Sequence, residues 1–109
     1  MKIKKLILMI LVAFLLVTLL NQPMAKKGDT VAVDYWLTAD GKQIDTSEGR
    51  GVFEFTLGNG DVIPGFDKAV EGMKVGEEKT VVLTGNDAYT QGPLAGKDLT
   101  FKIILREIK

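Results

Sequence analysis

The side chains that could do chemistry in this 109-residue chain are mostly aromatic, because the sequence contains no histidine and no cysteine. That composition excludes a Ser-His pair, a thiol nucleophile, disulfides and an imidazole metal site. The fourteen acidic residues are scattered without a ligand spacing, so we expect no metal and no cofactor. What remains is a set of rings: Tyr35, Phe53, Phe55, Phe66, Tyr89 and Phe101.

These rings allow two interpretations. A small domain buries its aromatic residues first, so the rings could simply form its core. Alternatively, some of them could line a pocket. The stretch "DVIPGFDKAVEGM" (61–73) raises this question most directly, since it places Phe66 at the start of one short helix.

The first 25 residues differ in composition from the rest of the chain. Lys2, Lys4 and Lys5 precede fifteen residues, 6–20, of which only Thr18 is polar. We therefore interpret residues 1–25 as a signal anchor or a signal peptide. Membrane contact through residues 3–20 would place the domain outside the cytoplasm, and cleavage of the leader would make it secreted or periplasmic.

Residues 26–109 form the folded domain, whose eleven Lys and Arg and fourteen acids give a net charge of −3. This mildly acidic, mixed-sign composition argues against a nucleic-acid partner, which would require a basic face. We expect a monomer.

Alternating apolar residues predict strands within this domain. Asp40-Gly41 predicts a hairpin after the first strand, because glycine takes positive φ without strain. Trp36 is adjacent to Tyr35 and must point to the opposite sheet face, so we expect it to pack or cover the surface. The predicted strands cover 31–37, 52–58, 77–84 and 98–108, with a fifth segment after the hairpin.

Only "PGFDKAVEGM" (64–73) has helical spacing, with Phe66, Val70 and Met73 at positions i, i+4 and i+7. Pro64 suits the first turn of a helix, where its missing N–H costs nothing. The predicted fold class is therefore α+β: an antiparallel sheet of about five strands with one short helix across a face, preceded by an N-terminal apolar helix.

Four stretches, in order, resemble the FKBP family of peptidyl-prolyl isomerases: "VAVDYWLTADGKQIDTS", "FEFTLGNGDVIPGFDKAVEGMKVGE", "DAYT" and "LTFKIILREI". The resemblance implies an FKBP-like, strongly curved sheet with the helix across its concave face. "PLAGKDLTF" (93–101) is similar to the SlyD-like branch, but the insert-in-flap chaperone domain of that branch is absent.

The resemblance also implies a pocket for a proline ring, with Phe66 as its floor. Tyr89 would bond the carbonyl before the proline, and the Ile63 N–H the carbonyl of the residue after it. Asp45, at the mouth, would either orient Tyr35 or face the rotating carbonyl. The implied catalytic residues are Asp45, Phe66 and Tyr89, and the implied substrate-binding residues are Tyr35, Ile44, Phe53, Val62, Ile63, Leu94 and Phe101.

Simpler interpretations of two of these residues remain open. Asp45-Thr46-Ser47 is also a turn sequence whose side chains bond to the backbone, and Tyr89 could be a core ring with an exposed hydroxyl. Ile44 stands where the family commonly has phenylalanine, so we expect only weak binding of macrolide inhibitors. The short flap offers Leu94 as its single apolar cap.

The expected function is peptidyl-prolyl cis-trans isomerisation in unfolded or extended, proline-containing polypeptides, through an apolar pocket that favours the twisted amide. One alternative is a non-catalytic peptide-binding or chaperone module that uses the same pocket. Another is a structural accessory domain in which Leu94 occludes the pocket.

Overall fold

The computed structural model describes residues 2–109 and, at position 19, the backbone alone. It confirms the predicted α+β class, with a long N-terminal helix, five antiparallel strands and one short helix. The elements are α1 (Lys2–Leu20), β1 (Thr30–Ala39), β2 (Lys42–Thr46), β3 (Phe53–Thr56), α2 (Pro64–Val70), β4 (Glu78–Leu83), the 3-10 turn η1 (Gly85–Asp87) and β5 (Leu99–Ile108).

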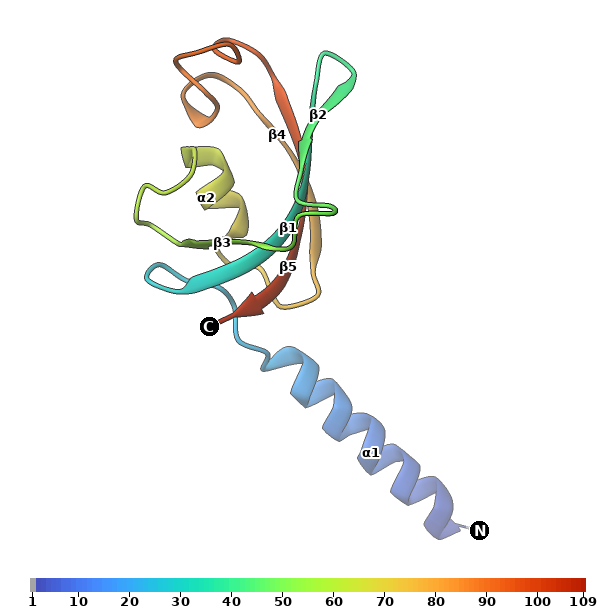
Figure 1. Ribbon diagram of the computed structural model, residues 1–109. Coiled ribbons are helices and arrows are strands. Elements are labelled where there is room, and N and C mark those ends of the chain that lie inside the picture. The colour runs from blue at the N-terminus through green and yellow to red at the C-terminus, as the bar shows by residue number, and fades with distance from the viewer. Residues whose placement is uncertain (1) are drawn as a thin grey trace.

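The sheet is built around β1 and β5, which pair antiparallel along almost their whole length. β4 pairs with the free edge of β5. The other edge of β1 carries two short strands, β3 along residues 30–33 and β2 along residues 36–39. The sheet curves strongly, and α2 lies against its concave side (Figure 1).

The hairpin predicted at Asp40-Gly41 is confirmed. Both residues have positive φ, 52° for Asp40 and 76° for Gly41, and they join β1 to β2. Aspartate tolerates this left-handed conformation better than most side chains, and glycine adopts it freely. The two-residue connection therefore sets Lys42 and Gln43 opposite Ala39 and Thr38, and the register then shifts by one residue before Asp45.

Helix α2 begins at Pro64, as predicted, after an extended Ile63. It ends at Val70 after about two turns, because Gly72 takes a φ of 88° that ends the helix. Met73 is nevertheless fully buried. Its side chain therefore belongs to the core, although it lies in the turn that follows the helix.

The packed part of the domain includes Ala25, which lies one residue before the predicted start of the domain. Ala25 is 2% exposed. Its N–H donates to the carbonyl of Met73 at 2.8 Å, and its carbonyl accepts from the N–H of Gly72 at 2.7 Å. No residue of α1 belongs to the core cluster of the described chain. The chain from residue 24 onward thus retains every core residue.

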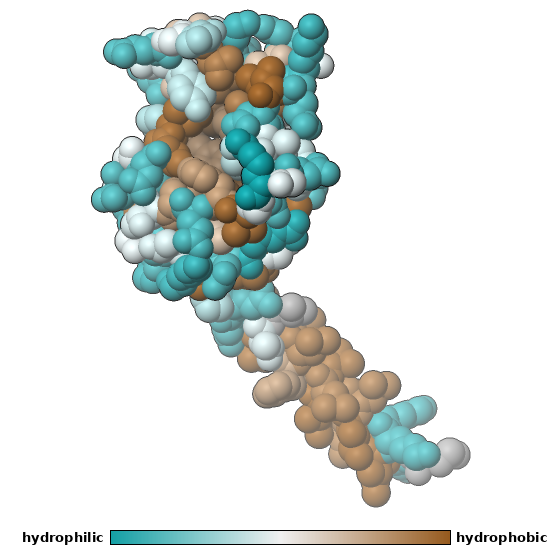
Figure 2. Space-filling view, viewed as in Figure 1, coloured by the Kyte–Doolittle hydropathy of each residue, from teal (hydrophilic) through white to brown (hydrophobic). Residues whose placement is uncertain are grey.

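Helix α1 extends away from the domain (Figure 1), and its apolar side chains are exposed along its length (Figure 2). Within the part of the chain that the structure describes, no helix combines the length and apolar character needed to cross a membrane. The expectation of a membrane anchor through residues 3–20 is therefore not supported.

Candidate active site

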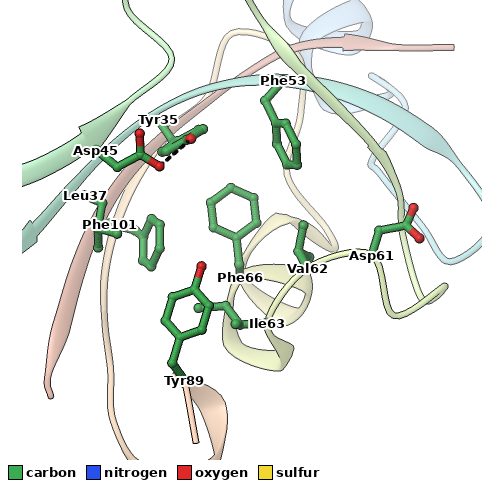
Figure 3. Close-up of a pocket in the computed structure, with 10 residues that line it drawn as sticks. All are labelled: Tyr35, Leu37, Asp45, Phe53, Asp61, Val62, Ile63, Phe66, Tyr89 and Phe101. Carbon is green, nitrogen blue, oxygen red and sulfur yellow. Dashed lines mark hydrogen bonds between the residues drawn. The ribbon is translucent and has the colours of Figure 1, made fainter. Parts of the chain in front are cut away.

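A pocket of about 150 Å³ opens between α2, the concave face of the sheet and the segment that follows η1. Most of its wall is aromatic or aliphatic, with two carboxylates and two phenolic hydroxyls. Figure 2 shows apolar surface gathered in a hollow of the domain, and Figure 3 shows the lining side chains. The lining residues are Tyr35, Leu37, Asp45, Phe53, Asp61, Val62, Ile63, Phe66, Tyr89 and Phe101.

Phe66 lies in the middle of the pocket residues (Figure 3). Its ring contacts Phe101 edge-on at 5.1 Å between centroids, Phe55 at 5.5 Å and Tyr35 at 6.0 Å. The edge-on geometry suits the quadrupoles of aromatic rings. Phe66 is only 4% exposed, yet it lines the pocket. The two interpretations of this ring therefore both hold: it is a core residue and also part of the pocket wall.

A polar network closes one side of the pocket. The hydroxyl of Tyr35 donates to Oδ2 of Asp45 at 2.8 Å, and Nη2 of Arg50 donates to Oδ1 of the same carboxylate at 2.7 Å. Arg50 also donates to the Tyr35 hydroxyl at 3.2 Å and to the carbonyl of Thr46. The Asp45 carboxylate is thus fixed from two sides while its side chain stays 44% exposed.

Burial raises the pKa of the Tyr35 hydroxyl above its ordinary value, and the hydrogen bond to Asp45 raises the pKa further. A nearby carboxylate disfavours the phenolate, since two negative charges would face each other. The Arg50 charge acts in the opposite direction but is the smaller influence. At neutral pH the hydroxyl keeps its proton and remains the donor to Asp45.

The opposite wall comes from the turn before α2. Ile63 is held extended because Pro64 follows it, and its carbonyl accepts from the N–H groups of Phe66 and Asp67. Its own N–H donates to no protein acceptor among residues 2–109. This group is therefore available to a carbonyl that enters the pocket.

Tyr89 is positioned by close packing of η1 against α2. A Cβ atom added at Gly65 would lie 2.6 Å from the carbonyl oxygen of Asp87, so only glycine allows this approach. Nζ of Lys68 adds an ion pair to the Asp87 carboxylate at 2.8 Å. Tyr89 follows two residues later, and its hydroxyl points toward the pocket (Figure 3).

The structure brings eight of the ten predicted site residues together and leaves two outside. Ile44 lies on β2 where the pairing with β1 shifts register, between Gln43 opposite Thr38 and Asp45 opposite Leu37. It does not line the pocket and is 44% exposed. Leu94 packs against the core cluster and does not line or cover the opening. The roles of the eight residues that do line the pocket remain predictions.

Three residues of the site were not predicted from the sequence. Leu37 follows from the strand alternation, because it shares a sheet face with Tyr35. Asp61 opens the same "DVIPGF" stretch that supplied Val62, Ile63 and Phe66. The third residue, Arg50, is distant from Tyr35 in sequence, and no local pattern indicates that it reaches the Asp45 carboxylate.

Trp36 lies on the other face of the sheet, as predicted. Its indole Nε1 donates to Glu48 at 2.9 Å, and Nζ of Lys102 lies 4.9 Å from the ring centroid. On the same face, hydrogen bonds from Ser47 and then Arg106 hold the pKa of Asp34 below its usual range. Trp36 does not belong to the pocket.

A curved antiparallel sheet around one short helix, with an aromatic pocket between them, defines the class of domain. Residues 22–106 match the family described as FKBP-type peptidyl-prolyl cis-trans isomerase. The chain belongs to this family, which confirms the resemblance found in the sequence.

Similar proteins from bacteria bear the name trigger factor. The trigger factor of Staphylococcus epidermidis is 43% identical over 84 residues, which are 77% of this chain and 19% of that protein. The trigger factor of Staphylococcus aureus strain Newman is 42% identical over 86 residues, which are 79% of this chain and 20% of that protein. The matched part of the chain thus spans about a fifth of these relatives.

Proposed function

We propose that this domain is a peptidyl-prolyl cis-trans isomerase acting on unfolded or extended polypeptides. The observation that carries the proposal is the aromatic pocket with Phe66 at its centre and the Tyr35–Asp45 hydrogen bond at its side. An apolar cavity of about 150 Å³ has room for a benzene ring. The five-membered ring of proline fits a pocket of the same volume.

The chemistry requires no nucleophile and no proton transfer. Rotation of a peptide bond crosses a barrier of about 18–20 kcal/mol, which arises from amide resonance. The bond is twisted at the transition state, conjugation is lost and the amide becomes less dipolar. Water solvates the planar amide better than the twisted one. A dry pocket therefore favours the twisted amide selectively, which is differential binding of the transition state.

The polar groups of the site support this rotation. Under the proposal, the Ile63 N–H holds the carbonyl of the residue after proline, and the Tyr89 hydroxyl bonds the carbonyl before it. Asp45 orients Tyr35 and presents a carboxylate near the rotating carbonyl, whose negative charge decreases as the bond twists. Lowering the barrier by about 5 kcal/mol would accelerate rotation by nearly four decades.

A proline-limited refolding assay tests the proposal. Micromolar protein, used as the chain from residue 24 onward, should accelerate refolding of the substrate. We expect Tyr89→Phe to reduce the acceleration without changing stability, since it removes one half-exposed hydroxyl. Phe66→Ala should abolish most activity, but it also removes a core ring, which typically costs about 3–5 kcal/mol of stability. A refolding rate that wild-type protein leaves unchanged would refute the isomerase proposal.

The second candidate function is binding of extended segments without turnover, as in a chaperone module. It is favoured by Leu94, which is half-buried against the core cluster and does not line the pocket, so a bound peptide would be captured only weakly. Suppression of aggregation without any effect on proline-limited refolding would distinguish this function from catalysis.

We also propose that residues 1–25 direct export of the domain. Support comes from three lysines ahead of an apolar helix that contributes nothing to the core of the described chain. Mass determination of the mature N-terminus after expression in a bacterium tests whether a leader is removed. Recovery of the intact chain in the cytoplasmic fraction alone would refute export.

A further inference from the structure

Two carboxylates lie on opposite sides of the pocket, Asp45 on one side and Asp61 on the other (Figure 3). Asp45 is paired with Arg50 at 2.7 Å. Asp61 accepts hydrogen bonds from the Thr56 N–H at 3.1 Å and from Nδ2 of Asn59 at 3.3 Å. It takes part in no ion pair within the described residues. The charge of Asp45 is therefore balanced, and the charge of Asp61 is not.

The turn that contains Gly58 and precedes Asp61 is contacted by a second carboxylate and by the side chain of Lys27. Asp67, on α2, accepts the N–H of Gly58 with both carboxylate oxygens at 3.1 Å and likewise has no ion pair in the described chain. The Asp61 side chain is exposed and extends beyond Val62, away from the ring cluster (Figure 3). It is therefore accessible to a polypeptide that leaves the pocket, but it does not contact a ring seated inside.

The position of Asp61 determines which residues of a bound peptide lie next to its carboxylate. Under the proposed function, on which this inference rests, the Ile63 N–H holds the carbonyl of the residue after proline. The chain then continues past Val62 toward Asp61, because these residues directly precede Ile63 along the same rim. Asp61 thus faces residues on the carboxyl side of the proline.

We propose that Asp61 gives this site a preference for Lys or Arg at the second residue after the proline. An exposed ion pair of this kind changes affinity by about two- to fivefold. Asp61 lies away from the rotating bond, so it interacts equally with the planar and twisted amides. Such uniform binding alters the affinity for substrate and leaves the turnover number unchanged.

The test compares three peptides that differ at one position with a fourth in which the lysine is moved to the other side of the proline. Three carry Lys, Ala or Glu at the second residue after proline, and the fourth carries Lys at the second residue before it. For the full chain, Kd is measured by calorimetry, and kcat and KM by isomerisation. We expect Kd and KM to rise in the order Lys, Ala, Glu with equal kcat. The differences should vanish near 1 M salt, where the Debye length is about 3 Å.

Two variants assign the effect to one side chain. Asp61→Asn keeps an oxygen acceptor for the Thr56 N–H and should remove the preference. Glu71→Gln removes one charge from an exposed residue outside the pocket and should keep the preference. Equal affinity for the first three peptides, or no binding of any, would overturn the inference. So would a preference for Lys before the proline.

The two proposals fail separately. If the Lys peptide binds more tightly but no peptide isomerises faster, the preference stands and the isomerase proposal falls. If all peptides isomerise faster with equal KM, the isomerase proposal stands and the preference falls.

Discussion

The Tyr35 hydroxyl and the Asp45 carboxylate share a 2.8 Å hydrogen bond, and Arg50 contacts both groups. Three residues from β1, β2 and the following loop therefore form one unit at the edge of the pocket. A unit of this kind positions a carboxylate more firmly than a single hydrogen bond does.

Replacing Asp45 should lower activity strongly and lower the stability of the fold only slightly. Under the proposed function, we expect Asp45→Ala to lower kcat/KM at least tenfold, because Tyr35 would lose its acceptor and the rotating carbonyl its charged neighbour. The free energy of unfolding should fall by less than about 1 kcal/mol, since the Asp45–Arg50 pair is largely exposed. Proline-peptide kinetics and urea titration check the two effects, with Glu48→Gln as a control on the far face. Full activity in Asp45→Ala would remove this residue from the mechanism.

The close approach of Gly65 to η1 predicts that alanine at this position destabilises the protein. Alanine favours a helix by about 1 kcal/mol over glycine, so Gly65→Ala would stabilise α2 if space allowed. Its Cβ would instead lie 2.6 Å from both the Asp87 carbonyl oxygen and a methyl of Leu83. We expect a net loss of about 1–3 kcal/mol by urea titration, together with lower activity as Tyr89 shifts. Glu71→Ala, which is exposed at the end of α2, should change neither.

The burial of Ala25 predicts that stability depends on where the chain begins. A chain that begins at Lys26 loses two backbone hydrogen bonds, to Met73 and Gly72, each contributing about 0.5–1.5 kcal/mol. We expect its free energy of unfolding to be about 1–3 kcal/mol lower than that of a chain that begins at Met24. Urea unfolding measures this difference, and the two chains should have equal m-values. A chain that begins at Asn21 should match the Met24 chain. Identical midpoints for all three would show that these bonds contribute nothing.

The raised pKa of Tyr35 predicts a loss of stability at high pH. Its folded pKa lies above the ordinary value of 10.0, so the folded protein holds this proton more tightly than the unfolded chain. The resulting stabilisation is fully present below pH 10.0 and is lost as the pH rises through the folded pKa. Urea midpoints measured across this range should fall more steeply for wild type than for Tyr35→Phe. Urea midpoints that fall equally with pH in both proteins would contradict the raised pKa of Tyr35.

The strands and the hairpin could be predicted because their causes are local. Alternation in 31–37 and 98–108 reflects one buried sheet face, and Asp40-Gly41 fits the positive φ of both turn residues. Most of the pocket was predicted because the resemblance to the family covers the stretches that supply it. The burial of Met73 could be predicted from its helical spacing, although the residue lies in the turn after α2.

The remaining errors concern tertiary contacts. Ile44 was assigned to the pocket through the family resemblance, but it lies at a register shift of β2 and does not line the pocket. Leu94 was expected over the opening because it is the apolar residue of a short flap, but it is half-buried against the core cluster and does not line the pocket. Arg50 could not be found from the sequence, because its partners come from β1 and β2 through the fold.

Strand β1 pairs with β3 along residues 30–33 and with β2 along residues 36–39. Between these two parts, Ser47 makes the hydrogen bonds to β1 that a neighbouring strand would otherwise make. Its N–H donates to the Tyr35 carbonyl at 3.0 Å, and its hydroxyl accepts the Tyr35 N–H at 3.0 Å. The two short strands are thereby aligned against β1 independently of each other. Gly51 and Val52, which follow Arg50 and precede β3, are thus a place where the length of the chain can change without disturbing either alignment. Evolution or a designer could remodel the entrance there and leave the scaffold intact.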